Sequence, residues 1–297
     1  MTLTATDHLL DGRAVAADML ARVRGEAASL AARGDPARLV SVSIGASEAV
    51  TIYVRNQRRS AERVGIAFIE RQFAANVPRE DVLRGLRDLN EDPEFTGIII
   101  QRPVPPHLSI RELQGAVDPG KDVEGMHPAS IGNIVYNDLA LAPCTASAAV
   151  ELLRRTGRPL VGLETVVIGH SEIVGKPIAF LLMAEGATVT VCHHMTRDLA
   201  LHSRRADAVF VAVGRPGLIT GDMLKPGTVL IDIGINRVAG PGGSRIVGDA
   251  DFESCAAVAG RITPVPGGVG PVTVAILMQN AVTAARRLRT AAPAVPA

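Results

Sequence analysis

Helical and strand-like segments alternate along nearly the whole chain, and this alternation limits the fold more than any other feature. In the first half, short apolar runs predict buried strands at 39–44, 66–69 and 97–100. Apolar periodicity predicts helices at 12–32, 51–64 and 82–89. The second half repeats the pattern, with strands expected at 165–168, 188–192, 208–213 and 229–233. Strands that alternate with helices indicate parallel sheets with crossover helices.

Length and composition narrow the class of protein. A chain of 297 residues is too long for one small core, so two domains are expected. A hydrophobic fraction of 47% with 21% charged residues is typical of a soluble globular protein. The net charge of +1 argues against partners held by bulk charge, such as nucleic acid or a membrane surface. No apolar run approaches the roughly 20 residues of a membrane span, and the N-terminus has no signal-peptide pattern.

Three scattered cysteines, Cys144, Cys192 and Cys255, have neither metal-ligand spacing nor a disulfide pattern. This usage fits the reducing cytoplasm, which is the predicted location. No metal site is expected.

The run from Ile262 to Thr273 holds three prolines and three glycines within twelve residues and carries no charge. Such a segment fits neither a helix interior nor a central strand. We interpret it as a rigid, buried loop that lines a ligand site, with a purely structural turn as the alternative. A last long helix is expected from about 272 to 288, beginning near Pro271.

A strand at 165–168 is followed by a glycine loop and then by an apolar helix, with Gly169, Ser171 and Gly175 in the loop. This order favours a dinucleotide site, because the N–H groups of the helix N-terminus bind phosphate. The GxGxxG fingerprint itself is absent, since Ser171 stands at its second glycine. Glycines at 214 and 234 follow the next strands, where such folds bind ligands.

The next strand ends in His193 and His194 rather than in the acid that often grips the ribose of NAD. With His170 they favour a 2′-phosphate, and hence NADP, with NAD still possible. The alternative is that these histidines are ordinary polar loop residues.

Together these motifs resemble the methylenetetrahydrofolate dehydrogenase/methenyltetrahydrofolate cyclohydrolase family. The resemblance runs from about Asp11 to Arg287. It rests on segments matched in order along the chain: 97–103 (GIIIQRP), 121–125 (KDVEG), 143–145 (PCT), 169–175 (GHSEIVG), 231–236 (IDIGIN) and 262–273.

The resemblance implies an α/β protein with a folate-binding domain, a Rossmann-type domain with a parallel sheet, and a cleft between them. The boundaries expected are 1–144 plus 284–297 for folate, since the last helix returns to that domain, and 145–283 for NAD(P). A homodimer is also implied. The cofactor-binding residues expected are Gly169, His170, Ser171, Ile173, Val174, Gly175, His193, His194, Gly214, Gly234, Ile235 and Thr273. The family has arginine at position 170 and commonly serine at 194.

The family oxidises 5,10-methylenetetrahydrofolate and then hydrolyses the methenyl product to 10-formyltetrahydrofolate. The residues expected at the folate site are Tyr53, Gln57, Gln101 and Glu124 as catalytic groups, with Tyr53, Gln101, Pro103, Glu124, Pro264, Gly268 and Pro271 binding substrate.

The hydrolytic residues of the family are altered in this chain. Its lysine, four residues after the tyrosine, is Gln57, which cannot take a proton near neutral pH. The family's serine is Val50, and the second aspartate of its DVDG motif is Glu124. We therefore predict that hydride transfer to NADP persists and that hydrolysis is weak or lost. The alternatives are a dehydrogenase of a different pterin and a non-catalytic folate- or nucleotide-binding paralogue.

For other charged residues near these motifs the sequence predicts a role less specifically. Asp122 is expected to bond backbone amides in its loop. Lys121 is expected either to contact folate or to be solvated. The arginine-rich stretch 55–63 is interpreted as a solvated helix face, with the glutamate tail of folate as the alternative partner.

Overall fold

A computed structural model describes residues 8–45, 48–240 and 243–291. Its contacts divide the chain into two compact units. Unit 1 comprises the described residues up to Ala17 together with Pro143–Thr273, and unit 2 comprises Asp18–Ala142 and the described residues from Val274. Helices α1 (Gly12–Ala32) and α10 (Val269–Ala291) each contribute to both units. The ligand-based boundaries at 144/145 and 283/284 stay a prediction, because contacts alone assign no ligand to a unit.

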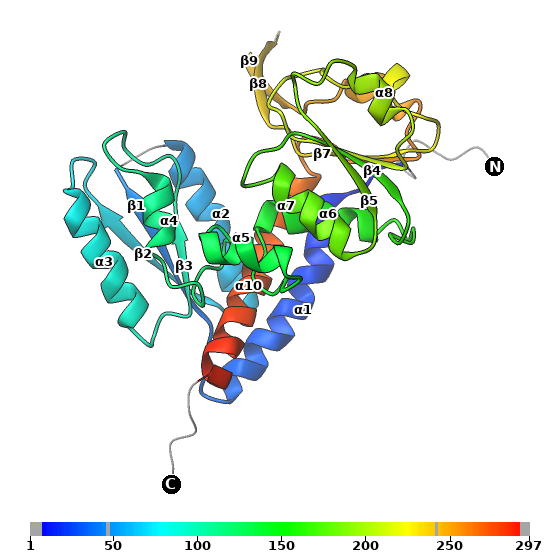
Figure 1. Ribbon diagram of the computed structural model, residues 1–297. Coiled ribbons are helices and arrows are strands. Elements are labelled where there is room, and N and C mark those ends of the chain that lie inside the picture. The colour runs from blue at the N-terminus through cyan, green and yellow to red at the C-terminus, as the bar shows by residue number, and fades with distance from the viewer. Residues whose placement is uncertain (1–7, 46–47, 241–242, 292–297) are drawn as a thin grey trace. The chain divides into compact units, whose positions relative to one another are not determined.

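Unit 2 is built on a three-stranded parallel sheet in the order β2-β1-β3. The strands are β1 (Arg38–Ile44), β2 (Ala67–Phe73) and β3 (Gly97–Ile100), and the helices between them are α2 (Glu48–Val64) and α3 (Arg79–Glu91). Figure 1 shows α2 and α3 on opposite sides of this sheet. Strand alternation explains the arrangement, because Val40, Val42 and Ile44 pack with α3 while Ser41 and Ser43 point to the other face.

The segment 103–143, between β3 and the next long helix, contains two short helices, α4 (Ile110–Gly115) and α5 (Pro128–Val135). Ser109 caps α4 by accepting a hydrogen bond from the Glu112 N–H, and Pro128 stands in the first turn of α5. The segment after β3 lies alongside that strand, where Ile98 and Asp122 form a parallel bridge. Residues 121–124 are therefore held next to the end of the sheet.

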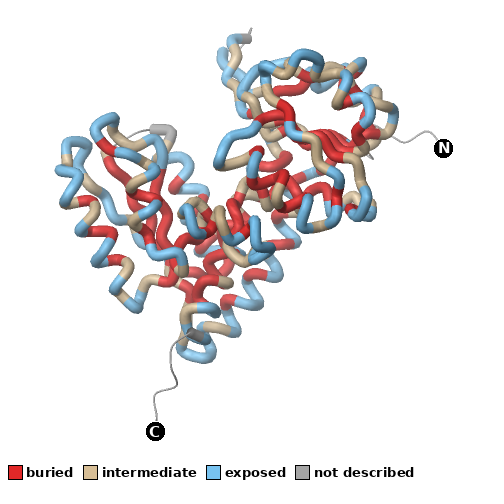
Figure 2. The backbone as a smooth tube through the Cα atoms, in the orientation of Figure 1, coloured by how far each residue is buried: buried red, intermediate tan, exposed pale blue. Residues whose placement is uncertain are grey.

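Unit 1 is built on a five-stranded parallel sheet in the order β10-β7-β6-β4-β5. Its strands are β4 (Glu164–Ile168), β5 (Thr188–Cys192), β6 (Ala208–Val211), β7 (Val229–Asp232) and β10 (Arg261–Ile262). One face carries α6 (Cys144–Arg154) and α7 (Gly175–Ala184), and the other α8 (Leu199–Ser203), a 3-10 turn at Gly221–Met223 and α9 (Phe252–Ala256). Figure 2 shows the buried residues concentrated along the strands of each unit. The predicted two-domain α/β fold with parallel sheets is confirmed.

Two features differ from expectation. Strands β8 (Asn236–Gly240) and β9 (Gly243–Val247) pair antiparallel, which was not anticipated. In the glycine- and proline-rich run, α10 starts at Val269, two residues before Pro271, so the end of the run is helical. The rest of the run is irregular and mostly buried or half-buried, with a cis peptide between Val265 and Pro266. Among the described residues, no helix is both long and apolar enough to span a membrane.

Candidate functional site

The glycine loop after β4 closes so tightly that it excludes side chains. A Cβ on Gly175 would lie 1.9 Å from the Gly169 carbonyl oxygen, and one on Gly169 would lie 2.3 Å from the Ala212 carbonyl oxygen. Gly169 has a φ of 123°, which L-residues rarely adopt. The loop therefore brings its backbone against both α7 and the end of β6, as a phosphate-binding turn requires.

The N-terminus of α7 is open to a ligand. Within the part of the chain that the structure describes, no side chain caps it. The Ser171 hydroxyl instead accepts the Val174 N–H at 3.2 Å and holds the loop's own shape. Ile173 is half-buried in the same turn. The Lys176 N–H donates to the Ser171 carbonyl oxygen at 3.0 Å, and Pro177 has no N–H. The turn therefore forms a cradle that favours an anion through the positive end of the helix dipole and the close approach of its glycines, which fits the phosphates of a dinucleotide.

The three predicted histidines gather beside this cradle, at the ends of the adjacent strands β4 and β5. The ring centroids of His170 and His193 are 4.8 Å apart, and those of His193 and His194 are 6.3 Å apart. The Nδ1 of His193 accepts the Met195 N–H at 3.2 Å, which fixes that ring. The cluster places three imidazole rings, which can donate hydrogen bonds, at the ends of two adjacent strands beside the glycine loop.

The remaining predicted cofactor residues lie on the loops after β6 and β7 and on α10. The N–H of Gly214 donates to Asp249, and that of Gly234 donates to Asp232. Ile235 presents an apolar side chain that is 72% exposed. The Thr273 hydroxyl donates to the Val269 carbonyl within α10.

Pro264, Gly268 and Pro271, predicted to bind substrate, also belong to unit 1. Their segment is packed tightly against the start of α1. The Gly268 N–H donates to the Pro264 carbonyl at 2.8 Å, and a Cβ on Gly12 would lie 1.7 Å from the Gly268 carbonyl oxygen. Gly12 is thus required for this contact, which the sequence did not indicate.

In unit 2 the predicted hydrolytic residue is joined to a predicted substrate residue. The Gln101 amide Nε2 donates to Gln57 Oε1 at 2.8 Å and to Ser41 Oγ at 3.0 Å. All three side chains are buried, with Gln57 only 2% exposed. The helical spacing sets Tyr53 one turn before Gln57, and Tyr53 as a residue is 48% exposed. A neutral amide network thus occupies the position where the family has a lysine.

Glu124 lies next to this network at the end of β3. Its Oε2 accepts the Ile100 N–H at 3.1 Å. Burial raises the pKa of Glu124 to about 7, although the nearby Arg102 guanidinium opposes the rise. Pro103 follows Arg102 through a cis peptide. The carboxyl therefore changes its charge near neutral pH.

The neighbouring charged residues have structural roles. Asp122 accepts the His127 N–H and the Ser130 hydroxyl, each at 2.7 Å, so it holds its own loop as expected. Lys121 differs from both predicted alternatives. Its side chain is buried, and its ammonium donates to three carbonyl oxygens at the end of α3, those of Leu89, Asn90 and Asp92.

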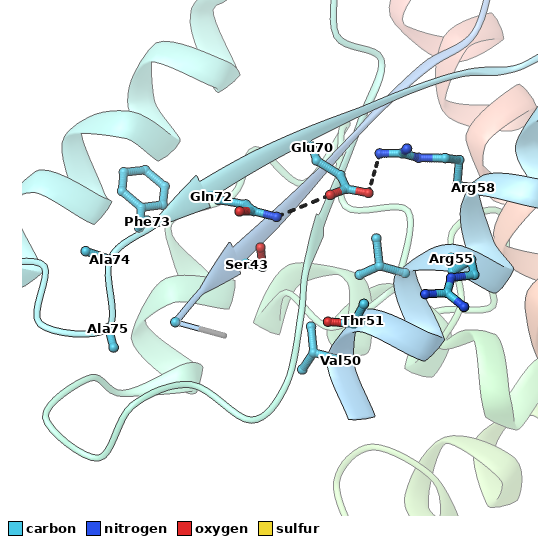
Figure 3. Close-up of a pocket in the computed structure, with 12 residues that line it drawn as sticks. Ser43, Val50, Thr51, Arg55, Arg58, Glu70, Gln72, Phe73, Ala74 and Ala75 are labelled. Carbon is cyan, nitrogen blue, oxygen red and sulfur yellow. Dashed lines mark hydrogen bonds and ion pairs between the residues drawn. The ribbon is translucent and has the colours of Figure 1, made fainter. Parts of the chain in front are cut away.

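A cavity of about 610 Å³ lies between α2 and the ends of β1 and β2. Val50, at the position of the family's serine, lines it together with Thr51 and Arg55 (Figure 3). Arg58, also at its wall, pairs with Glu70, which accepts a second hydrogen bond from Gln72 at 3.3 Å. The four arginines of the stretch 55–63 are exposed, as expected for a solvated helix face, and one of them, Arg58, also pairs with a protein carboxylate.

Two further observations concern metal ligands and cysteines. No group of three or more His, Cys, Asp or Glu residues able to hold a metal ion occurs among the described residues. All three cysteines are described, all are buried, and no disulfide joins them.

Models of two protein domains match the chain. The tetrahydrofolate dehydrogenase/cyclohydrolase catalytic domain matches residues 10–124, and the NAD(P)-binding domain of the same family matches residues 143–289. The bifunctional protein FolD 2 of Mesorhizobium japonicum is 61% identical over 97% of this chain and 95% of its own. The bifunctional protein FolD of Rhodobacter capsulatus is 61% identical over 95% of this chain and 94% of its own.

Solved structures agree. The FolD methylenetetrahydrofolate dehydrogenase/cyclohydrolase of Campylobacter jejuni has a TM-score of 0.90 at 36% identity, covering 94% of this chain and 99% of its own. The Trypanosoma brucei enzyme, solved with NADP and an inhibitor, has a TM-score of 0.89 at 39% identity, covering 95% of this chain and 98% of its own. The chain belongs to the tetrahydrofolate dehydrogenase/cyclohydrolase family.

Proposed function

We propose that this chain oxidises 5,10-methylenetetrahydrofolate to the 5,10-methenyl form with NADP+, and that it hydrolyses the methenyl product weakly or not at all. The dehydrogenase activity follows from the family and from the phosphate cradle of unit 1. The loss of hydrolysis rests on one observation, the buried amide pair of Gln57 and Gln101.

Hydride transfer requires that the pterin and the nicotinamide be correctly positioned, and it needs no general acid or base. Bound NADP+ supplies the nicotinamide ring that accepts the hydride with its two electrons. In this proposal Gln101, Glu124 and Tyr53 hold the pterin, and the turn at Gly169–Gly175 holds the cofactor phosphates. His170 and His194 select the 2′-phosphate. No side chain gains or loses a proton in this step, so the change at position 57 leaves it intact.

Hydrolysis makes a different demand. Water adds to the methenyl carbon, one of its protons must be removed, and a ring nitrogen must be protonated as the ring opens. A tuned general acid/base contributes about 100-fold or more to such a step. Gln57 cannot supply this proton transfer, because an amide does not titrate near neutral pH. Its carbonyl oxygen is also already engaged by the Gln101 N–H group.

Both activities can be measured on one preparation. We expect NADPH formation that depends on methylenetetrahydrofolate, with NADP+ preferred over NAD+, and ring opening of methenyltetrahydrofolate close to the buffer rate. Gln57→Lys should raise ring opening about 100-fold, once the Gln101 amide turns its oxygen toward the ammonium. Gln57→Met, of similar length but without a titratable group, should not. Rapid ring opening by the unchanged protein would show that another residue supplies the proton transfer.

We also propose that the chain forms a homodimer in the cytoplasm and binds neither nucleic acid nor membranes. The family resemblance supports the dimer, the cysteines without disulfides support a reducing compartment, and the net charge of +1 supports the absence of polyanionic partners. Sedimentation velocity should give twice the monomer mass.

A further inference from the structure

Asp249 is a fully buried carboxylate in the segment after β9. Its hydrogen bonds hold the loop 213–215, which belongs to the predicted cofactor site. It accepts three consecutive backbone N–H groups, from Val213 at 2.6 Å and from Gly214 and Arg215 at 2.9 Å each. The Asn236 side-chain amide donates to it at 2.8 Å. All four of these donors are uncharged amides, so the loop after β6 is wrapped around a carboxylate solvated by backbone dipoles.

Asp232, the last residue of β7, fastens the segment that carries Asp249. Its carboxylate accepts the N–H groups of Gly234, Asp249 and Ala250 at 2.9, 3.0 and 2.9 Å. The packing leaves no space for adjustment, because a Cβ on Gly234 would lie 2.3 Å from the Asp249 carboxyl carbon. A Cβ on Gly248 would lie 1.9 Å from an Asp232 oxygen. The loops after β6 and β7 are thus fixed to each other through two carboxylates.

The position of these loops decides which part of a dinucleotide they meet. Strands β6 and β7 are neighbours, with Val211 paired to Asp232, and β6 lies next to β4, which carries the glycine loop. In a doubly wound α/β fold, the two halves of the dinucleotide lie on opposite sides of the point where the strand order reverses. In this sheet that point lies between β4 and β6. The histidine cluster occupies the β4–β5 side. The loops after β6 and β7, with Gly214 and Ile235, lie on the other side, toward the nicotinamide half.

We propose that Asp249 is a positioning residue for the nicotinamide half of NADP and acts through the loop 213–215 and Asn236. The proposal rests on the NADP-dependent function proposed above. Replacing the carboxylate by an amide puts an NH2 group where an oxygen accepted backbone N–H donors, so at least one donor must turn away. The loops then relax locally, while the glycine turn at Gly169–Gly175 lies on other strands and keeps its shape.

The test separates the two halves of the cofactor. Adenosine 2′,5′-bisphosphate carries the adenine and the 2′-phosphate but lacks nicotinamide. For Asp249→Asn we expect kcat with saturating NADP+ to fall at least tenfold and calorimetric NADP+ affinity to weaken. The inhibition constant of adenosine 2′,5′-bisphosphate should stay within about twofold of the unchanged protein. Asn236→Ala removes one donor and leaves the carboxylate. It should lower kcat and NADP+ affinity by a smaller factor and again leave the inhibition constant of the bisphosphate nearly unchanged.

Asp251→Asn is the matched control. Asp251 lies two residues away and caps α9 by accepting the Ser254 N–H at 3.0 Å, a role that asparagine also fills. Asp251→Asn should change neither the NADP+ affinity nor the inhibition constant of adenosine 2′,5′-bisphosphate. The proposal is wrong if Asp249→Asn weakens both ligands equally, which means general loosening of unit 1, or if it changes neither.

The remaining outcomes are also decisive. Should Asp249→Asn not fold, Asn236→Ala decides by the same comparison of the two ligands. Failure of the proposed function looks different, because the unchanged protein would then form no NADPH. The calorimetric comparison of NADP+ with the bisphosphate would still test the role of Asp249.

Discussion

Glu124 is a half-buried residue whose ionisation should make substrate binding depend on pH. Burial raises its pKa from 4.5 to about 7, so the carboxyl is largely protonated at pH 6 and largely ionised at pH 8. Pterin ring N–H donors bind a carboxylate better than a carboxylic acid. The KM for methylenetetrahydrofolate should therefore fall about tenfold as the pH rises from 6 to 8. Steady-state kinetics across this range measure it.

Glu124→Gln is the comparison, because it keeps the shape of the side chain and cannot ionise. Its KM should be higher at pH 8 and nearly constant with pH. The same pH profile in both proteins would assign the titration to another group.

Single residues also mark the limit of what the sequence can predict. Helical spacing was enough to set Tyr53 and Gln57 on one face, because both lie on one element. It was not enough for Asp249, whose four donors come from residues 13 to 36 positions earlier in the chain. Lys121 was predicted as a folate contact or a solvated cation and is neither. Its partners lie at the end of a helix about 30 residues before it.

That lysine predicts how α3 is held at its C-terminus. The last carbonyls of a helix have no partner within the helix, and a cation there also interacts favourably with the helix dipole. Lys121→Met should lower the free energy of unfolding by about 2 kcal/mol, because it leaves buried carbonyls without a charged donor. Urea denaturation measures the loss. Arg87→Met, on the exposed side of α3, should change stability by less than about 0.5 kcal/mol. Equal effects would argue against the cap.

The glycine turn before α7 gives a second prediction at this scale. Gly175→Ala forces a Cβ to within 1.9 Å of the Gly169 carbonyl oxygen, so the turn must open. We expect NADP+ affinity to fall at least tenfold, measured by calorimetry. Gly25→Ala is the control, because α1 is open there and no atom lies within 4 Å of the added methyl group. That variant should be neutral or slightly more stable. Unchanged NADP+ binding by Gly175→Ala would contradict a phosphate-binding role for the turn.

Elements were predictable where burial imposes a pattern. The strands at 97–100 and 188–192 coincide with the observed β3 and β5. Strand β3 is buried along its whole length and is apolar throughout, and β5 alternates threonine with valine, so each carries a recognisable strand pattern although both lie at a sheet edge. The antiparallel pair of β8 and β9 was not predicted, because the residues of β9 are mostly exposed and show no alternation of apolar and polar residues. The start of α10 at Val269 was not predicted, because Pro271 suggested a later start, whereas a proline is tolerated within the first helical turn.

At the scale of the whole molecule, the order of elements along the chain differs from their grouping in space. Unit 1 includes the described residues from position 8 to Ala17, and unit 2 includes the part of α10 from Val274 onward. Alternating strands and helices predicted the two parallel sheets, since local patterns decide them. They did not predict that the first residues belong with the second sheet, where Leu9 forms a bridge with Ile262. Such pairing depends on contacts about 250 residues apart.

The C-terminal part of α10 supplies a test of this grouping. The buried amide of Asn280 donates to the carbonyl oxygens of Val123 at 2.9 Å and Ala142 at 3.2 Å. It thereby ties the last helix of unit 2 to the residue before Glu124. Asn280→Ala leaves two buried carbonyls short of a donor and should lower the free energy of unfolding by about 2 kcal/mol.

The functional consequence of Asn280→Ala should be confined to the folate side. We expect a severalfold higher KM for methylenetetrahydrofolate, because the loop that positions Glu124 loses its anchor. The inhibition constant of adenosine 2′,5′-bisphosphate should not change, since its proposed contacts all lie in unit 1. Gln279→Ala, the exposed amide next to it, is the matched control and should alter neither constant. If Asn280→Ala weakened binding of the bisphosphate as much as binding of the folate, this part of α10 would stabilise both units, and the two ligand sites would not be independent.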